Sequence, residues 1–150
     1  MITEHRRTGP SGAARALIAS ALLLVSGAGH AADLEIVVTG LSSAAGNVHM
    51  ALYDNPDKFP DSDGMVVEVE APITGSTARH VFKDLAAGRY AVATYHDEND
   101  NDEFDQGFLG IPLEDYAFSS GATAFLSPPS FDAAAFRLTV DQRLSIPIND

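Results

Sequence analysis

From Leu34 onward, apolar residues recur at every second position of the chain. The alternation is clearest in five segments: Leu34/Ile36/Val38, Val48/Met50/Leu52, Met65/Val67/Val69, Phe136/Leu138/Val140 and Leu144/Ile146/Ile148. Successive side chains of a strand point to opposite faces, so a period of two predicts strands with one buried face. No window of a dozen residues has the spacing of an amphipathic helix, and an all-β fold is therefore expected.

Clusters of turn-forming residues separate these strands. They lie at residues 42–47, 54–56, 61–64, 73–76 and 84–88. About seven short strands joined in this way predict an antiparallel Greek-key β-sandwich, immunoglobulin-like or prealbumin-like. Residues 104–131 lack the alternation and contain three Pro and three Gly, which predicts one long irregular loop.

Two residues carry further information about the strands. Tyr90 follows Gly88 at the start of the strand expected over residues 90–96, the position of a corner tyrosine that bonds to an upstream backbone carbonyl. The alternative is an ordinary turn followed by a half-buried aromatic residue. Pro147 lies among the outward residues of the last strand, which predicts an edge strand or the end of one.

The first 32 residues have the three-part layout of a secretory signal. Arg6, Arg7 and Arg15 are followed by an apolar stretch over residues 16–25 and then by small residues. The apolar stretch is about half the length that a membrane-spanning helix needs. We therefore expect a cleaved signal over residues 1–32, a single domain over residues 33–150, periplasmic or secreted location, and no membrane span after processing.

The charge balance excludes several classes of partner. The full chain carries 9 Lys and Arg against 21 Asp and Glu, a net charge of -12, and loss of residues 1–32 would leave 6 against 20, a net charge of -14. Such a field repels phosphate backbones, which argues against nucleic-acid binding and favours cations. The chain has no Cys, so disulfides, thiolate nucleophiles and Cys-type zinc sites are excluded.

Residues 97–105 form an acidic segment directly after a predicted strand. Six of these nine residues are Asp or Glu, and none is basic. Like charges about 6 Å apart repel by roughly 0.7 kcal/mol per pair even in bulk water. A compact conformation of this segment is therefore unfavourable unless a cation is bound.

The spacing of oxygen donors in this segment is typical of a calcium loop. Positions 1, 3, 5, 7 and 9 of such a loop are taken by Asp97, Asn99, Asn101, the Glu103 backbone carbonyl and Asp105. Asp102 and Phe108 replace the glycine of position 6 and the glutamate of position 12, so an EF-hand is excluded. A calcium loop on a β scaffold, completed by Glu114 or Asp115, and a solvated acidic hairpin tip both remain as interpretations.

Two motifs together give the chain a resemblance to a known family. The first motif covers residues 95–105 and has His-Asp-Glu-Asn-Asp-Asn at its centre. The second covers residues 110–119 and reads Gly-Ile-Pro-Leu-Glu-Asp-Tyr-Ala-Phe-Ser. Further similarity lies in residues 46–54, Phe59, Phe82 and residues 88–90. The chain resembles the bacterial family known as domain of unknown function 2141 over nearly all of residues 33–150. It departs from the family pattern at Asp102 and Ala117, where glycine is common. The resemblance implies export and a small β domain, and it implies no activity.

Other candidate site residues are few. His96 precedes the acidic segment and is expected to orient it by hydrogen bonding. Tyr116 and Phe118 are candidates for the wall of a ligand groove. His49, His80 and His96 fall on three separate strand segments, so a three-histidine zinc site is disfavoured.

These observations favour an exported, non-enzymatic β-sandwich module that binds calcium through its acidic segment and recognises a protein or glycan partner at the envelope or cell surface. One alternative is a small metal-assisted hydrolase that uses His96 with Asp97 or Glu114. The other is a purely structural envelope protein whose acidic segment is only solvated.

Overall fold

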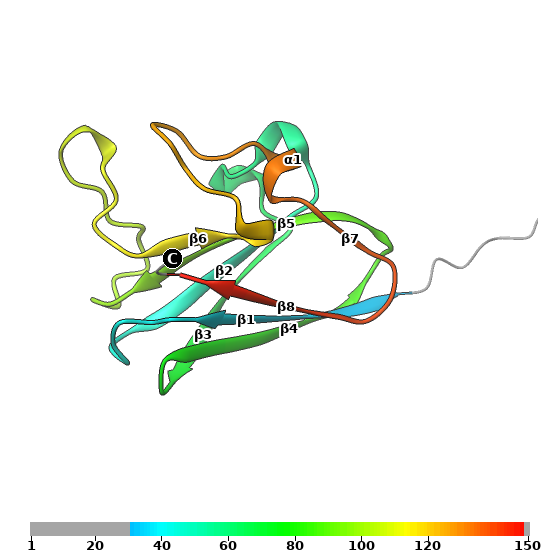
Figure 1. Ribbon diagram of the computed structural model, residues 1–150, viewed down its shortest axis with the longest axis horizontal. Helices are drawn as coiled ribbons and strands as arrows, with labels where there is room; N and C mark the ends of the chain where they lie inside the picture. Colours follow the sequence, from blue (N-terminus) through cyan, green and yellow to red (C-terminus); the bar gives the residue numbers. More distant parts are fainter. Residues whose placement is uncertain (1–30, 149–150) are drawn as a thin grey trace, which may run out of the picture.

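Eight strands make up most of the regular structure of the protein (Figure 1). The structure is a computed structural model that describes residues 31–148. The strands are β1 (Ala32–Thr39), β2 (Asn47–Tyr53), β3 (Val67–Thr74), β4 (Thr77–Leu85), β5 (Gly88–Asp97), β6 (Tyr116–Phe118), β7 (Phe136–Leu138) and β8 (Gln142–Pro147). Single turns of 3-10 helix form η1 (Pro56–Lys58), η2 (Ser62–Gly64), η3 (Phe108–Gly110) and η4 (Ser119–Gly121), and α1 (Phe131–Ala134) is one turn of α-helix. The all-β prediction is confirmed.

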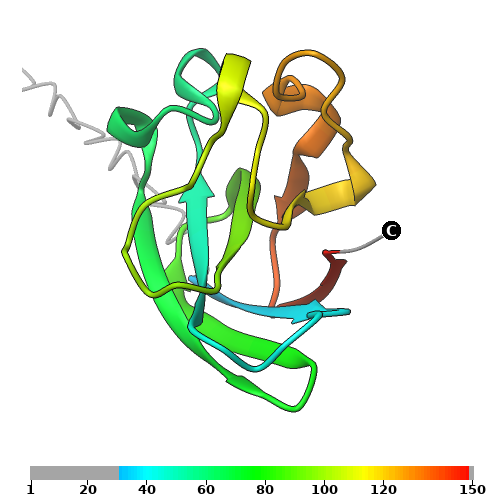
Figure 2. The same ribbon diagram turned by 90° about the vertical axis from the view of Figure 1, so that its left-hand side faces the viewer.

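The strands form one continuous mixed sheet in the order β6-β5-β2-β3-β4-β1-β8, and β7 also pairs with β5. Every pairing is antiparallel except that of β1 with β8, which is parallel. The sheet curves so far that it is nearly a barrel (Figure 2). The predicted seven-strand, immunoglobulin-like or prealbumin-like Greek-key sandwich is therefore not confirmed. Alternation of apolar residues shows which face of a strand is buried, but it does not show which strand lies beside it.

The main hydrophobic core lies inside the curve of this sheet. Alternate residues of β1, β2 and β5 supply its completely buried centre: Leu34, Ile36, Val38, Val48, Met50, Leu52 and Val92. A second cluster forms on the other face of β2 and β5, around Ala51, Tyr53 and Ala91. Segments 54–66 and 119–135 pack over that face, and they stand above β5 and β6 in Figure 1.

Local contacts agree with several details expected from the sequence. The Tyr90 hydroxyl donates a hydrogen bond to the Ala86 carbonyl at 2.8 Å, the contact that a corner tyrosine makes. Pro147 is the last residue of β8, which is the terminal strand of the sheet order. Residues 104–131 are irregular apart from short turns and the three-residue strand β6, which has too few residues to show a period.

Substitution of Val92 by Asp is expected to abolish cooperative folding. Val92 has no exposed surface and packs in the main core, and an unpaired buried charge costs several kcal/mol against a typical total stability of about 5–15 kcal/mol. Val140→Asp is the matched control because Val140 is 70 % exposed, and its effect should stay within about 0.5 kcal/mol. Urea denaturation followed by circular dichroism measures both. Equal stabilities of the two variants would contradict the assigned face of β5.

Candidate functional site

The acidic segment begins where β5 ends, with a carboxylate that has no exposed surface. Asp97 Oδ1 accepts a hydrogen bond from the Asn101 backbone N–H at 3.2 Å, and Oδ2 accepts one from the Asp102 N–H at 2.8 Å. Burial raises the pKa of Asp97, but the backbone N–H groups of Asp102, Asn101 and Asp100 outweigh it, and the pKa lies below its usual value. Asp97 is therefore an anion around which the segment folds.

The backbone of the acidic segment turns tightly at Asp100 and Asp102, although it has no glycine there. Asp100 and Asp102 adopt φ values of 59° and 60°, in the left-handed region. Aspartate tolerates this region better than most residues because its short side chain can bond locally. The absence of glycine at position 6 therefore does not prevent the turn.

Two of the predicted ligand side chains, those of Asn99 and Asn101, meet at Asp105. The Asn99 amide donates to Asp105 Oδ2 at 2.6 Å, and the Asn101 amide lies 3.3 Å from both carboxylate oxygens. The Asp105 N–H donates to Glu114 Oε2 at 3.1 Å. Glu103 donates its backbone N–H to Asn101 Oδ1 at 3.0 Å, while its own side chain is exposed. Residues 97–105 and Glu114 thus form one cluster, which we call the acidic cluster.

Glu114 brings a buried oxygen with no partner to this cluster. Its Oε1 atom has no hydrogen-bond partner within residues 31–148. Burial raises the pKa of Glu114, the Asp105 N–H opposes this, and the nearby Asp97 and Asp105 carboxylates raise it further. A buried anionic oxygen without a partner is unfavourable, and a bound cation would satisfy it.

His96 contacts a neighbouring loop and not the acidic segment itself. Its Nε2 lies 2.8 Å from the Ala45 carbonyl oxygen, and its backbone N–H donates to the Asp115 carbonyl at 2.9 Å. Next to Ala45, Gly46 has φ +64°, and a Cβ atom there would lie 1.7 Å from the Asp97 carbonyl oxygen. His96 and Gly46 therefore hold residues 40–46 against the end of β5.

An apolar cleft of about 860 Å³ lies beside the acidic cluster. Its aromatic and methionine side chains are Tyr53, Met65, Tyr95, Phe104, Tyr116 and Phe118. Tyr116 and Phe118, the two residues expected to line a groove, are both in its wall. The ring of Phe104 lies 5.3 Å from that of Tyr95 and 5.9 Å from that of Tyr116, so the residue before Asp105 forms part of the same wall.

A hairpin-like arm over residues 105–113 joins the acidic cluster to the cleft. Its two sides are linked by the Gly107 N–H to the Ile111 carbonyl at 2.8 Å and by the Leu113 N–H to the Asp105 carbonyl at 2.9 Å. The arm exposes Phe108, Leu109, Ile111 and Leu113, each by 61–84 %. Exposed apolar side chains gathered on one projecting element are typical of an interaction surface.

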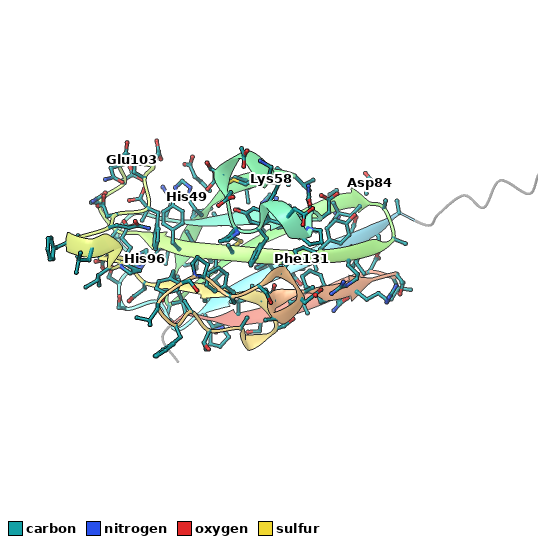
Figure 3. The ribbon with its side chains drawn as sticks, turned by 90° about the horizontal axis from the view of Figure 1, so that it is seen from above. His49, Lys58, Asp84, His96, Glu103 and Phe131 are labelled. Carbon is teal, nitrogen blue, oxygen red and sulfur yellow. The ribbon has the colours of Figure 1, made fainter. Side chains whose placement is uncertain are left out.

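A buried histidine that was not predicted from the sequence lies beside the acidic cluster. His49 on β2 is 5 % exposed, and its ring stacks on Tyr95 at 4.6 Å. Its Nδ1 lies 3.4 Å from Glu68 Oε1 and its Nε2 lies 3.6 Å from Asp97 Oδ2. Figure 3 shows His49 at the same end of the molecule as His96 and Glu103. Alternation places His49 on the face opposite to that of Val48 and Met50, but it does not show that β3 lies beside this face.

These features define a small all-β domain whose fifth strand ends in an ordered acidic cluster beside an apolar cleft. The family model described as an uncharacterized protein conserved in bacteria (DUF2141) matches residues 36–146, and the chain belongs to this family. The resemblance noted from the two motifs is thereby confirmed. No curated protein and no solved structure matches the chain. Among residues 31–148, no helix has the length and apolarity needed to cross a membrane.

Substitution of Gly46 by Ala is expected to destabilise the protein more than substitution of Gly75 by Ala. Both glycines have positive φ, +64° and +66°, but a Cβ at Gly75 meets nothing within 4 Å. The strain of positive φ costs about 1 kcal/mol in either variant, and the clash with Asp97 adds roughly 1–3 kcal/mol at Gly46 only. Urea unfolding of the two variants measures the difference. Equal losses would contradict the close packing of Gly46 on Asp97.

Proposed function

We propose that the protein is an exported, non-enzymatic module that binds calcium at the acidic cluster. The observation that carries this proposal is the buried, unpartnered Glu114 Oε1 beside the Asp105 carboxylate. Among the described residues, Glu114 forms no ion pair, and calcium binds readily to several oxygens of differing types. Asp97, Asn99, Asn101, Asp105, Glu114 and the Glu103 carbonyl are the proposed ligands.

The donor chemistry favours calcium over magnesium. All proposed ligand atoms are oxygens, and they come from carboxylates, amides and a backbone carbonyl, which calcium accepts in flexible geometry. Turning the Asn99 amide about its last side-chain bond exchanges Nδ2 for Oδ1 beside Asp105, so the same side chain serves as a donor without the ion and as a ligand with it. Magnesium requires a tighter octahedron and gives up its water reluctantly.

Calcium would fix the base of the arm over residues 105–113. Asp105 begins the arm, and Glu114 follows it directly, so one ion would tie both ends. The arm and the adjoining cleft offer apolar side chains and few hydrogen-bonding groups, which fits a protein partner at the envelope or surface better than a glycan. The binding role therefore depends on calcium through the position of the arm.

The burial of His96 and Asp97 favours a binding function over hydrolysis. A hydrolase would use His96 with Asp97 or Glu114, but His96 is 2 % exposed with its Nε2 bonded to a backbone carbonyl, and both Asp97 oxygens accept backbone hydrogen bonds. A substrate would have to displace these contacts before reaching either group. The purely structural alternative is separated from calcium binding by the calcium experiment below.

The mature protein is expected to begin at Ala32, one residue before the boundary at residue 33 that the sequence alone predicts. Residues 1–30 of the proposed signal lie outside the described residues, but Ala32 is the first residue of β1 and is 2 % exposed in the main core. Cleavage after Ala31 would keep this core residue, whereas cleavage after Ala32 would remove it. N-terminal sequencing of exported protein measures the boundary. Recovery of the intact chain from Met1 in a membrane fraction would contradict export by cleavage.

Calcium is expected to stabilise the protein against heat. Sites of this extracellular type bind at about 0.1–1 mM, so 10 mM calcium should add about 1.4–2.7 kcal/mol to the free energy of unfolding, or several degrees in Tm. Glu114→Gln should remove most of this shift while leaving the metal-free Tm unchanged or higher, because it removes a buried, unpartnered charge. Differential scanning calorimetry with and without calcium measures both effects.

Glu103→Gln is the matched control for this experiment. It makes the same chemical change at an exposed side chain of the same cluster, and it leaves the proposed carbonyl ligand in place. The calcium shift should persist in this variant and should be smaller with magnesium. An equal shift from sodium chloride at the same ionic strength, or an equal calcium response of the two variants, would identify the acidic segment as only solvated.

A further inference from the structure

A second group of potential metal ligands lies beside Asp97. One ligand atom from each of His49, Glu70 and Asp102 lies within 4.8 Å of one from each of the other two. Glu70 pairs directly with His49 across β2 and β3, and Asp102 comes from the acidic segment. We propose that His49, Glu70 and Asp102 form a site for a divalent transition-metal ion of the zinc class, separate from the calcium site.

The unpartnered nitrogen of His49 carries this proposal. Its Nε2 atom is buried and has no hydrogen-bond partner among the described residues. It lies 3.6 Å from Asp97 Oδ2 and 3.8 Å from Asp102 Oδ1, too far for hydrogen bonds. A buried imidazole nitrogen facing carboxylates at this separation has room for an ion between them.

The surroundings of His49 prepare Nε2 as a ligand. Glu68 Oε1 lies 3.4 Å from Nδ1, on the opposite side of the ring. A carboxylate at one ring nitrogen favours the proton there and leaves the lone pair of the other nitrogen for a metal, an arrangement common around metal-bound histidines. Stacking on Tyr95 at an interplanar angle of 15° fixes the ring in this orientation.

The donor set selects the class of ion. An imidazole nitrogen with carboxylate oxygens suits zinc and other first-row transition metals, whereas calcium prefers oxygen ligands alone. Tetrahedral bonds of about 2.1 Å place ligand atoms roughly 3.4 Å apart, so the present group must contract slightly. Glu70 and Asp102 are both exposed, and their side chains can make this adjustment.

None of the three ligands belongs to the proposed calcium set. Asp97, a proposed calcium ligand, contacts this second group as well: its Oδ2 atom lies 3.6 Å from His49 Nε2 and accepts the Asp102 N–H. The alternative to a metal is a protonated His49 held by the surrounding carboxylates. That arrangement would satisfy the same charges without an ion, and it predicts no selective zinc binding.

Zinc binding to the full, untagged protein tests the proposal. After treatment with a chelator, the protein is titrated with zinc by calorimetry in 10 mM calcium, and with cobalt(II) while the visible absorption of the bound ion is recorded. Asp102→Gly removes one ligand and keeps a residue that tolerates the observed φ of 60°. Glu70→Gln removes the second ligand from an exposed position. Glu103→Gln is the control, because it makes the same change in charge at a residue outside the proposed zinc site.

We expect one zinc equivalent to bind in the presence of calcium. Asp102→Gly and Glu70→Gln should each weaken zinc binding at least tenfold and lose the cobalt absorption, while Glu103→Gln should bind like the wild type. Asp102→Gly should keep its calcium-dependent Tm shift, which separates this site from the calcium site. No zinc binding, zinc displaced by calcium in competition, or unchanged zinc affinity in both ligand variants would overturn the proposal.

Discussion

The candidate site depends on the hydrogen bonds between the buried carboxylate of Asp97 and the backbone of the acidic segment. Asp97 ends β5, and it holds the acidic segment in a tight turn through the N–H groups of Asn101 and Asp102. An anion without exposed surface is stable only where hydrogen bonds replace its water. The turn that supplies these donors also directs Asp105 toward Glu114, and through them it sets where the arm over residues 105–113 begins.

Two buried polar atoms near Asp97 lack partners within residues 31–148, and they differ in chemistry. Glu114 Oε1 is a hard anionic oxygen among other oxygens, while His49 Nε2 is an imidazole nitrogen facing carboxylates. Native proteins leave few buried polar atoms unsatisfied, and such atoms at one end of a domain call for an explanation. Hard and borderline ions prefer these different donors, so the proposed calcium and zinc ions would each satisfy one of the two atoms.

The sequence predicted the strands well and their arrangement poorly. Alternation located β1, β2 and β8 because it reports burial, but it could not show that β8 lies parallel to β1. Calcium-loop spacing correctly grouped Asn99 and Asn101 with Asp105, because local spacing fixes local geometry. The same reasoning missed His49, since its neighbours Glu68 and Glu70 come from β3 and Asp102 comes from a segment about fifty residues away.

If charge repulsion alone mattered, Asp97 would be one of six equivalent carboxylates, and removing it should stabilise the metal-free protein. Its burial reverses that expectation, because removing it would leave the N–H groups of Asn101 and Asp102 without their partner. Asp97 thus orders the turn before any ion arrives, so little binding energy is needed to fold it. The ion would act chiefly on Asp105 and Glu114, where like charges meet and an oxygen has no partner. Calcium binding would therefore chiefly stabilise the base of the arm, the element that carries the exposed apolar side chains.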